Sequence, residues 1–134
     1  MTVDPLTPIL VVDDNKTMTR IIRGLLNQIG FEDVDNAPDG SEAFAKMRQR
    51  KYGLVISDWN MGFMTGYELL KKVRSDTQLA RTPFIMVTAE SKSENVIAAK
   101  NSGVDNYIVK PFTAETLKSK IESVKSKIEA VLGN

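Results

Sequence analysis

Short strand-like runs, most of them apolar, alternate with stretches of helical periodicity five times along this chain. The runs cover residues 9–12, 34–37, 54–57, 83–87 and 104–109, and they predict strands. Between them apolar residues recur every three or four positions, and the spacing from Leu117 to Val131 predicts one continuous last helix. This alternation implies right-handed crossovers and an α/β fold, with a five-stranded parallel sheet covered by helices on both faces. The run 34–37 is polar, as expected at a sheet edge.

Helix ends are also marked in the sequence. Gly30 is placed to end the first helix, and the turn at Pro38 and Asp39 leads into the second. Ser91 or Ser93 is predicted to cap the helix that ends before Gly103.

Length and composition limit the kinds of protein this can be. With 134 residues the chain fits one domain, which we place at residues 9–132, after a short leader at 1–8 that we expect to be extended and mobile. Eighteen basic and 17 acidic residues give a net charge of +1, so there is no overall electrostatic case for nucleic acid or an anionic membrane. No apolar run approaches the ~20 residues that cross a bilayer, and no secretion signal is present, so we expect a cytoplasmic protein.

The chain contains neither cysteine nor histidine. This excludes disulfides, thiol nucleophiles, imidazole ligands and serine–histidine catalysis. The chemistry left to the chain is that of oxygen ligands and lysine.

Polar residues follow four of the five predicted strands: Asp13, Asp14, Asp58, Thr88 and Lys110. Ligands of open parallel sheets bind at this carboxyl edge. Each residue has an ordinary alternative. The run Asp13-Asp14-Asn15 could serve helix capping, Asp58 could belong to a turn, Thr88 could be an ordinary strand residue, and Lys110 could be a surface lysine. Together they favour a site in which carboxylates hold Mg²⁺, Asp58 acts as a nucleophile toward phosphorus, and Thr88 and Lys110 bind the phosphoryl group.

Four motifs resemble one family closely: VVDDNKTMTR, VISDWNM with MTGYELL, MVTAE, and YIVKPFTAETL. They are similar to receiver domains of bacterial two-component signalling, and most of all to the CheY-like single-domain response regulators of chemotaxis. The resemblance covers the chain from Ile9 to Val131. It implies a flavodoxin-like (βα)5 fold with strand order 2-1-3-4-5.

The same resemblance implies roles for individual residues. Asp58 would be the phosphoacceptor, and Mg²⁺ would be held by Asp14, Asp58 and the backbone carbonyl of Asn60, with Asp13 acting through water. Thr88 and Lys110 would bind the phosphoryl group, the Lys110–Pro111 bond would be cis, and Tyr107 would be the aromatic switch. Asn60 and Glu90 would tune how long the phosphate persists.

The sequence departs from the family after the phosphoacceptor. Gly62 and Phe63 follow Met61 where the family commonly has proline, and Thr65 replaces a common aspartate. Because glycine has more backbone freedom than proline, we expect a looser loop, which bears on metal affinity and on the position of the Asn60 carbonyl.

The resemblance also implies partners. A chemotaxis histidine kinase would donate the phosphoryl group, and the flagellar motor switch protein would bind a face that includes Lys92, Tyr107 and Lys120; a phosphatase is a further candidate partner. We expect a monomer that is no enzyme toward external substrates. The alternatives are a phosphate sink with the same pocket but no motor binding, a haloacid-dehalogenase-type phosphatase, and a flavin or nucleotide binder. The phosphatase would need an acid where Asn60 stands, and the binder a glycine-rich loop where Asp13 and Asp14 stand.

Overall fold

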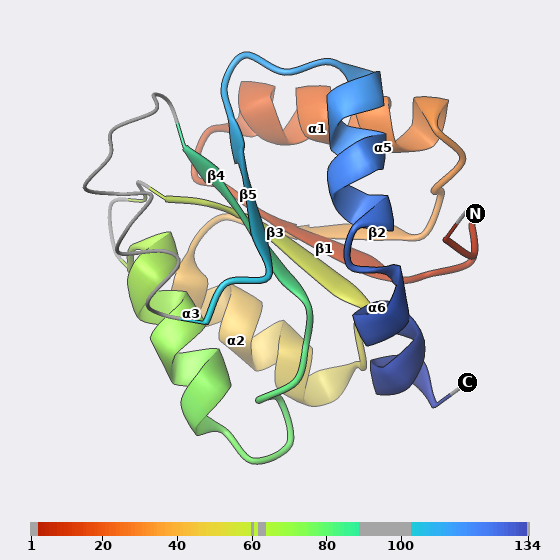
Figure 1. The fold of residues 1–134 in the computed structure, drawn as a ribbon. Coiled ribbons are helices and arrows are strands. Elements are labelled where there is room, and N and C mark those ends of the chain that lie inside the picture. Colours follow the sequence, from red (N-terminus) through yellow and green to blue (C-terminus); the bar gives the residue numbers. More distant parts are fainter. Residues whose placement is uncertain (1–2, 60, 62–63, 89–102, 134) are drawn as a thin grey trace.

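Five parallel strands form one sheet at the centre of the molecule (Figure 1). A computed structural model describes residues 3–59, 61, 64–88 and 103–133. The strands are β1 (Ile9–Val12), β2 (Val34–Ala37), β3 (Leu54–Asp58), β4 (Phe84–Thr88) and β5 (Asn106–Val109). Their order is β2-β1-β3-β4-β5, and every neighbouring pair is parallel. The predicted doubly wound fold is therefore confirmed, and the polar β2 lies at an edge as expected.

Helices cover both faces of the sheet. They are α1 (Lys16–Gln28), α2 (Gly40–Gln49), α3 (Gly66–Ser75), α5 (Ala114–Glu122) and α6 (Lys125–Leu132). Figure 1 shows α1 and α5 on one face and α2 and α3 on the other. The helix predicted between β4 and β5, with its proposed caps Ser91 and Ser93, lies outside the described residues.

Each face of the sheet has its own hydrophobic core. Ile9 and Val11 of β1 pack with the cluster that includes Ile22 of α1, whereas Leu10 and Val12 pack with the cluster that includes Met47 of α2. Successive side chains of a strand point to opposite faces, so a strand covered on both sides must be apolar at every position. This is why β1 reads as an unbroken apolar run.

The predicted start and end of α1 and the predicted start of α2 are confirmed. The Asn15 side chain caps α1, and the Asp39 carboxylate caps α2 by accepting a hydrogen bond from the Glu42 N–H. Gly30 follows α1 with a φ of +108°, a left-handed conformation that glycine adopts without steric cost.

The last helix differs from the prediction, because it is divided into α5 and α6. Apolar residues continue at helical spacing across the break, but the Ser123 hydroxyl bonds to the Lys120 carbonyl, and the Val124 N–H bonds to the Ile121 carbonyl three residues back. A serine that binds the backbone in this way competes with the helical ladder. The chain therefore bends after Glu122, and α6 folds over the end of the sheet where the strands begin.

α6 packs closely against the start of β3. A Cβ added to Gly53 would lie 3.1 Å from Leu132 Cδ1 and 3.2 Å from Ile128 Cγ2. At this position a glycine lets the helix approach the backbone.

Part of the expected leader is packed against the domain. The side chains of Val3 and Thr7 are buried, and Val3 joins the core on the α1 face. This packing was not anticipated by the prediction of an extended, mobile leader, while the domain boundaries at 9 and 132 remain predictions.

The β2 edge is held by side chains from α2 and the segment after it. Arg50 pairs with Asp33 and Asp35, the Tyr52 hydroxyl donates a hydrogen bond to Asp35 Oδ2 at 2.6 Å, and the Lys46 ammonium donates to the Asn36 carbonyl at 2.7 Å. This network fixes the polar strand to the rest of the molecule.

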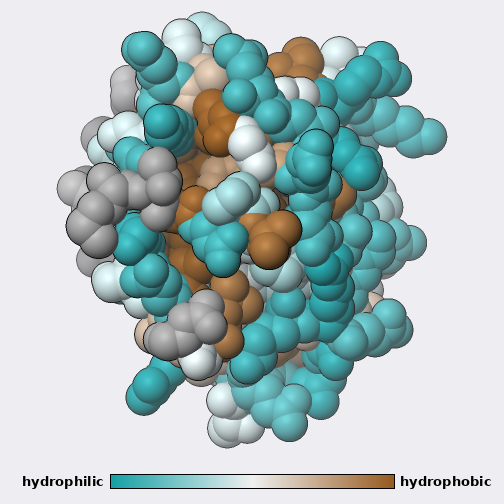
Figure 2. Space-filling model, turned by 90° about the vertical axis from the view of Figure 1, so that its right-hand side faces the viewer, coloured by the Kyte–Doolittle hydropathy of each residue, from teal (hydrophilic) through white to brown (hydrophobic). Residues whose placement is uncertain are grey.

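The face of the molecule that contains the carboxyl-terminal helices is largely hydrophilic (Figure 2). Figure 2 shows this face, on which hydrophobic side chains emerge as a limited band among hydrophilic ones. Among the described residues no helix is long and apolar enough to cross a lipid bilayer.

Candidate functional site

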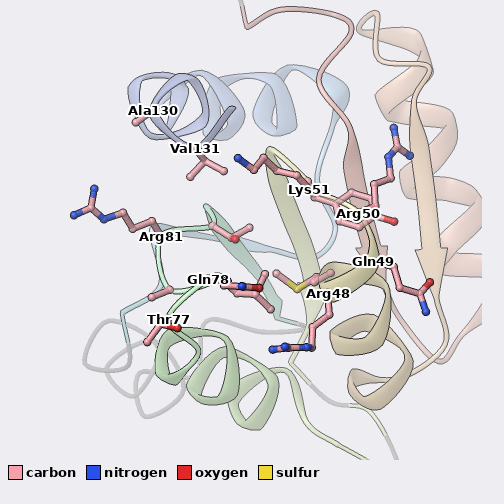
Figure 3. A pocket seen from close by; sticks show the side chains of 14 residues that line it. Arg48, Gln49, Arg50, Lys51, Thr77, Gln78, Arg81, Ala130 and Val131 are labelled. Atoms are coloured by element: carbon pink, nitrogen blue, oxygen red, sulfur yellow. The ribbon is translucent and has the colours of Figure 1, made fainter. Parts of the chain in front are cut away.

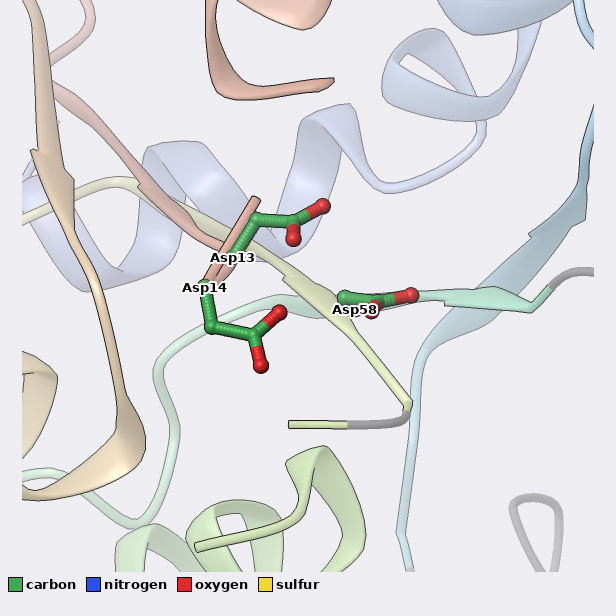
Figure 4. Close-up of side chains that lie close together, drawn as sticks. All are labelled: Asp13, Asp14 and Asp58. Carbon is green, nitrogen blue, oxygen red and sulfur yellow. The ribbon is translucent and has the colours of Figure 1, made fainter. Parts of the chain in front are cut away.

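Three carboxylates meet where β1 and β3 end (Figure 4). The register pairs Val12 with Ser57, so the residues that follow, Asp13 and Asp58, are neighbours at the carboxyl edge of the sheet. Asp13, Asp14 and Asp58 each place a carboxylate oxygen within 4.8 Å of the other two. The structure thus brings together the acids that the sequence predicted for one site.

Lys110 supplies a positive charge to this cluster. It follows β5, and its Nζ lies 3.0 Å from Asp58 Oδ1. Its backbone N–H donates a hydrogen bond to the Thr88 carbonyl at 2.8 Å, which ties it to the end of β4. The Lys110–Pro111 peptide bond is cis, as the resemblance implied.

Burial shapes the electrostatics of the acids. Asp58 is 8% exposed, and burial raises the pKa of its carboxyl, while the hydrogen bond from Lys110 acts in the opposite direction. Burial also raises the pKa of Asp13, against a hydrogen bond from the Asn15 N–H. Buried carboxylates close together are costly unless a cation accompanies them.

One buried oxygen identifies where a cation would be most needed. Asp13 Oδ2 is buried and has no hydrogen-bond partner among the described residues. An unsatisfied buried carboxylate oxygen beside two further carboxylates is a donor set that fits a hard divalent cation such as Mg²⁺.

Thr88 and Tyr107 lie on the same face of the sheet. Thr88 is buried at the end of β4 beside Val109, and Tyr107 lies beside Met86, two positions back along the pair of strands. Because side chains alternate along a strand, Thr88 and Tyr107 are diagonal neighbours. The predicted switch pair is thus close in space.

Lys120 of α5 lies beside Tyr107. Its Nζ is 5.1 Å from the centre of the Tyr107 ring and 3.4 Å from Asn106 Oδ1. These two predicted partner-face residues are therefore adjacent, whereas Asn60, Glu90 and Lys92 lie outside the described residues and their roles stay predictions.

Comparison with known proteins identifies the family. The response regulator receiver domain family matches residues 9–122. The chain is 46% identical to the chemotaxis protein CheY-3 of Vibrio cholerae over 116 residues. The aligned region covers 87% of this chain and 89% of CheY-3. The chain belongs to the response regulator receiver family. This receiver domain is also 45% identical over 120 residues to CheY of Pseudomonas aeruginosa, covering 90% of this chain and 97% of the relative.

Solved structures agree with this family. Vibrio cholerae CheY4 superposes with a TM-score of 0.82 at 37% identity, covering 89% of this chain and 98% of CheY4. A receiver domain protein from Clostridium thermocellum superposes with a TM-score of 0.84 at 27% identity, covering 94% and 99% of the two chains. The flavodoxin-like receiver fold expected from the sequence is thus confirmed.

Gly66 supports the receiver site in a way that sequence reasoning missed. A Cβ added to this residue would lie only 2.2 Å from the Asp58 carbonyl oxygen. The first turn of α3 therefore rests directly on the backbone of the central acid. Gly66 is the first residue of α3, and its contact with a residue eight positions earlier leaves no local pattern in the sequence.

Thr65 has a structural role that the motifs did not suggest. Its hydroxyl accepts a hydrogen bond from the Glu68 N–H at 3.1 Å, and the Glu68 carboxylate accepts one from the Thr65 N–H at 3.0 Å. This reciprocal capping box fixes the start of α3. Thr65, noted as a departure from the family, is thus a well-suited helix cap.

Proposed function

We propose that this receiver domain accepts a phosphoryl group on Asp58 from a phosphohistidine of a partner kinase, in a reaction that requires Mg²⁺. The proposal rests on one observation: Lys110 Nζ lies 3.0 Å from Asp58 Oδ1, and the carboxylates of Asp13 and Asp14 lie beside this pair. A nucleophile, a cation for the transferred group and a set of metal ligands are then present at one edge of the sheet.

Phosphoryl transfer here forms one bond and breaks another. An oxygen of the Asp58 carboxylate attacks phosphorus, the phosphorus–nitrogen bond of the donor breaks, and the imidazole nitrogen keeps the electron pair and takes up a proton from water. The product is an acyl phosphate on Asp58. Lys110 moves its hydrogen bond to a phosphoryl oxygen, and the Thr88 hydroxyl donates to another, which stabilises the added charge.

Asp13, Asp14 and Asp58 are the side chains that would hold Mg²⁺, together with the backbone carbonyl of Asn60. The metal, when bound, neutralises charge on the phosphoryl oxygens. The orphaned Oδ2 of Asp13 gives this assignment a physical basis, because a bound cation or its water satisfies an oxygen that no described residue reaches.

Trp59 gives a direct test of phosphoacceptor function. This single tryptophan follows Asp58 and stacks on Tyr67, with ring centres 5.5 Å apart. We expect saturable changes in its fluorescence on adding Mg²⁺ and then beryllium fluoride, and mass spectrometry should find one phosphoryl group on Asp58 after treatment with acetyl phosphate. Asp58→Asn should abolish the beryllium fluoride step.

A matched control is Asp4→Asn, the same amide replacement at an exposed acid that bonds only locally to the Leu6 N–H. It should leave both fluorescence steps unchanged. Absence of an aspartyl phosphate in the wild-type protein would contradict the proposal, as would a modification that persists in Asp58→Asn.

We further propose that the phosphorylated protein acts in chemotaxis, in the cytoplasm, by binding the flagellar motor switch protein through the face that contains Tyr107 and Lys120. The relatives named as chemotaxis proteins support this role. Thr88 moves toward the phosphoryl group, Tyr107 turns into the space released, and the adjoining surface changes. This is a shift between conformations rather than catalysis on an external substrate.

Binding to the motor switch protein tests the output. Beryllium fluoride should raise the affinity at least about tenfold, and Tyr107→Ala should remove most of that gain while keeping phosphorylation of Asp58. A phosphorylated protein with no affinity for the motor switch would indicate a phosphate sink instead.

A further inference from the structure

A basic hollow lies at the edge of the sheet opposite Asp58. Its volume is about 570 Å³, within the range of small-molecule sites. Three segments enclose it: residues 47–52 at the end of α2, residues 77–82 in the loop before β4, and residues 130–131 of α6. Both loops precede strands, so the hollow is at the amino edge and shares no residue with the phosphorylation site.

The lining carries positive charge without any acid. Arg48, Arg50, Lys51 and Arg81 line the hollow, and none of its 14 lining residues is aspartate or glutamate. Arg48 pairs with Asp76 just outside it, and Arg50 pairs with Asp33 and Asp35. Because carboxylates accompany Arg48 and Arg50, the positive charge that the hollow offers to a ligand is mainly that of Lys51 and Arg81.

Two of these cations have no ion-pair partner among the described residues, Lys51 and Arg81. Figure 3 shows the Lys51 amine directed toward Val131 of α6, whereas Arg50 and Gln49 point away from the hollow. Arg81 lies at the rim on the opposite side from Lys51, and its exposed side chain extends outward (Figure 3). Like charges around a concave surface repel one another, and an anion between them relieves that repulsion.

The floor between the cations is apolar. Met47, Leu79, Ala130 and Val131 contribute to it. A second hollow of about 260 Å³ adjoins it through Ala80, Arg81, Ala130 and Val131. An inorganic anion alone would leave this apolar surface uncovered.

We propose that the hollow binds a small organic polyphosphate, with the phosphates held by Lys51 and by Arg81, whose exposed side chain turns inward, and the organic part resting on the apolar floor. Arginine matches phosphate geometry with paired N–H donors, and lysine adds a point charge. The proposal does not depend on phosphorylation of Asp58. It concerns an additional ligand at the far edge of the sheet.

The test uses ADP, pyrophosphate and adenosine as probes, with EDTA present so that no metal complex forms at the acidic site. Backbone amide shifts in NMR should move saturably with ADP at residues 47–52 and 77–82, with a dissociation constant of ~1 mM or tighter. Pyrophosphate should bind more weakly than ADP, adenosine more weakly still, and added salt should weaken both charged probes.

Charge variants separate a site from general attraction. Lys51→Gln with Arg81→Gln should weaken ADP binding by about tenfold or more, because charge-assisted hydrogen bonds are lost. The matched control, Arg20→Gln with Arg23→Gln, removes the same charge from the exposed face of α1 and should leave binding unchanged. All four side chains are exposed, so both double variants should fold.

Several outcomes would overturn the proposal: no saturable shifts with ADP, shifts confined to the Asp58 edge, equal weakening in the two double variants, or pyrophosphate binding as tightly as ADP. Tighter binding of a short polyglutamate peptide than of ADP would also overturn it, because the hollow would then favour an acidic protein segment.

Discussion

Close approach of α3 to the site makes Gly66 sensitive to a single methyl group. A Cβ at this position would collide with the Asp58 carbonyl oxygen at 2.2 Å and with Met86 Sδ at 2.8 Å. We expect Gly66→Ala to lower the free energy of unfolding by about 1–3 kcal/mol, as overpacking does, and to weaken the response to beryllium fluoride by displacing α3. Urea denaturation and Trp59 fluorescence measure the two effects.

Gly24 in α1 provides the matched control. An added Cβ there meets nothing within 4 Å. Gly24→Ala should therefore be neutral or stabilise the protein by roughly 0.5–1 kcal/mol, because alanine favours the helix. Equal effects at the two glycines would mean that α3 does not rest on the Asp58 backbone.

Tyr52 gives the β2 edge a defined pH dependence. The hydrogen bond from its hydroxyl lowers the pKa of Asp35. Burial, and to a smaller extent the same hydrogen bond, raises the pKa of Tyr52 to about 12. Because the pKa of Asp35 is lowered in the folded protein, this group stabilises the fold at pH values above ~3.9, the ordinary pKa of aspartate. The contribution is lost as the pH falls through the lowered pKa. Because the pKa of Tyr52 is raised in the folded protein, this group stabilises the fold at pH values below ~10, the ordinary pKa of tyrosine. The contribution is lost as the pH rises toward the pKa of Tyr52 in the folded protein.

Tyr52→Phe tests this balance. The variant should be less stable than wild type between pH ~5 and ~9, and the difference should shrink on either side of that window, because Asp35 is protonated at one end and unfolded tyrosine ionises at the other. Urea denaturation at a series of pH values measures it. Tyr67→Phe is the control for loss of a hydroxyl, and a difference that stays constant with pH in Tyr52→Phe would refute the coupling.

At the scale of elements, the start of α3 depends on Thr65. Thr65→Ala removes an N-cap and half of the capping box, so the free energy of unfolding should fall by about 1 kcal/mol. Thr65→Ser keeps the hydroxyl and should retain most of the stability. Identical losses in the two variants, measured by thermal or urea denaturation, would show that the cap is not what stabilises α3.

Elements with a local pattern could be predicted, and those shaped by distant contacts could not. The burial of β1 could be predicted because all four of its residues are apolar. The edge position of β2 could be predicted because Asp35 and Asn36 are polar. The break between α5 and α6 was missed because apolar spacing continues across it, whereas what marks the break is a hydroxyl bond of Ser123 and a three-residue backbone bond of Val124.

The same distinction applies to the site. The ends of parallel strands share an edge, so strand order and residue type are enough to predict that Asp13, Asp58 and Lys110 meet. The orphaned oxygen of Asp13 depends on the packing around it. The basic hollow escaped prediction because its three walls lie far apart in the sequence.

At the scale of the whole molecule, Arg74 joins several segments. It pairs with Asp105 at 2.9 Å and donates hydrogen bonds to the carbonyls of Gly103, Ala80 and Thr82. Asp105 in turn accepts a bond from the Phe84 N–H at the start of β4. The pair therefore links α3, the loop before β4 and the approach to β5.

Arg74→Met should cost about 3–5 kcal/mol of unfolding free energy, because it leaves a largely buried Asp105 with less compensation. Lys127 also pairs with Asp105, but its side chain is 58% exposed, so Lys127→Gln should cost no more than about 1 kcal/mol. Chemical denaturation of both variants compares them. Similar costs would show that the arginine does not connect these segments.

The network along β2 also bears on how separate molecules behave toward one another. An edge strand offers unpaired backbone groups to which a foreign strand can add, the first step of aggregation. Here the Asn36 carbonyl is already bonded to Lys46, and Asp35 places a charge within the strand. The contacts that fasten β2 to its own domain thus also make it a poor template for a second chain.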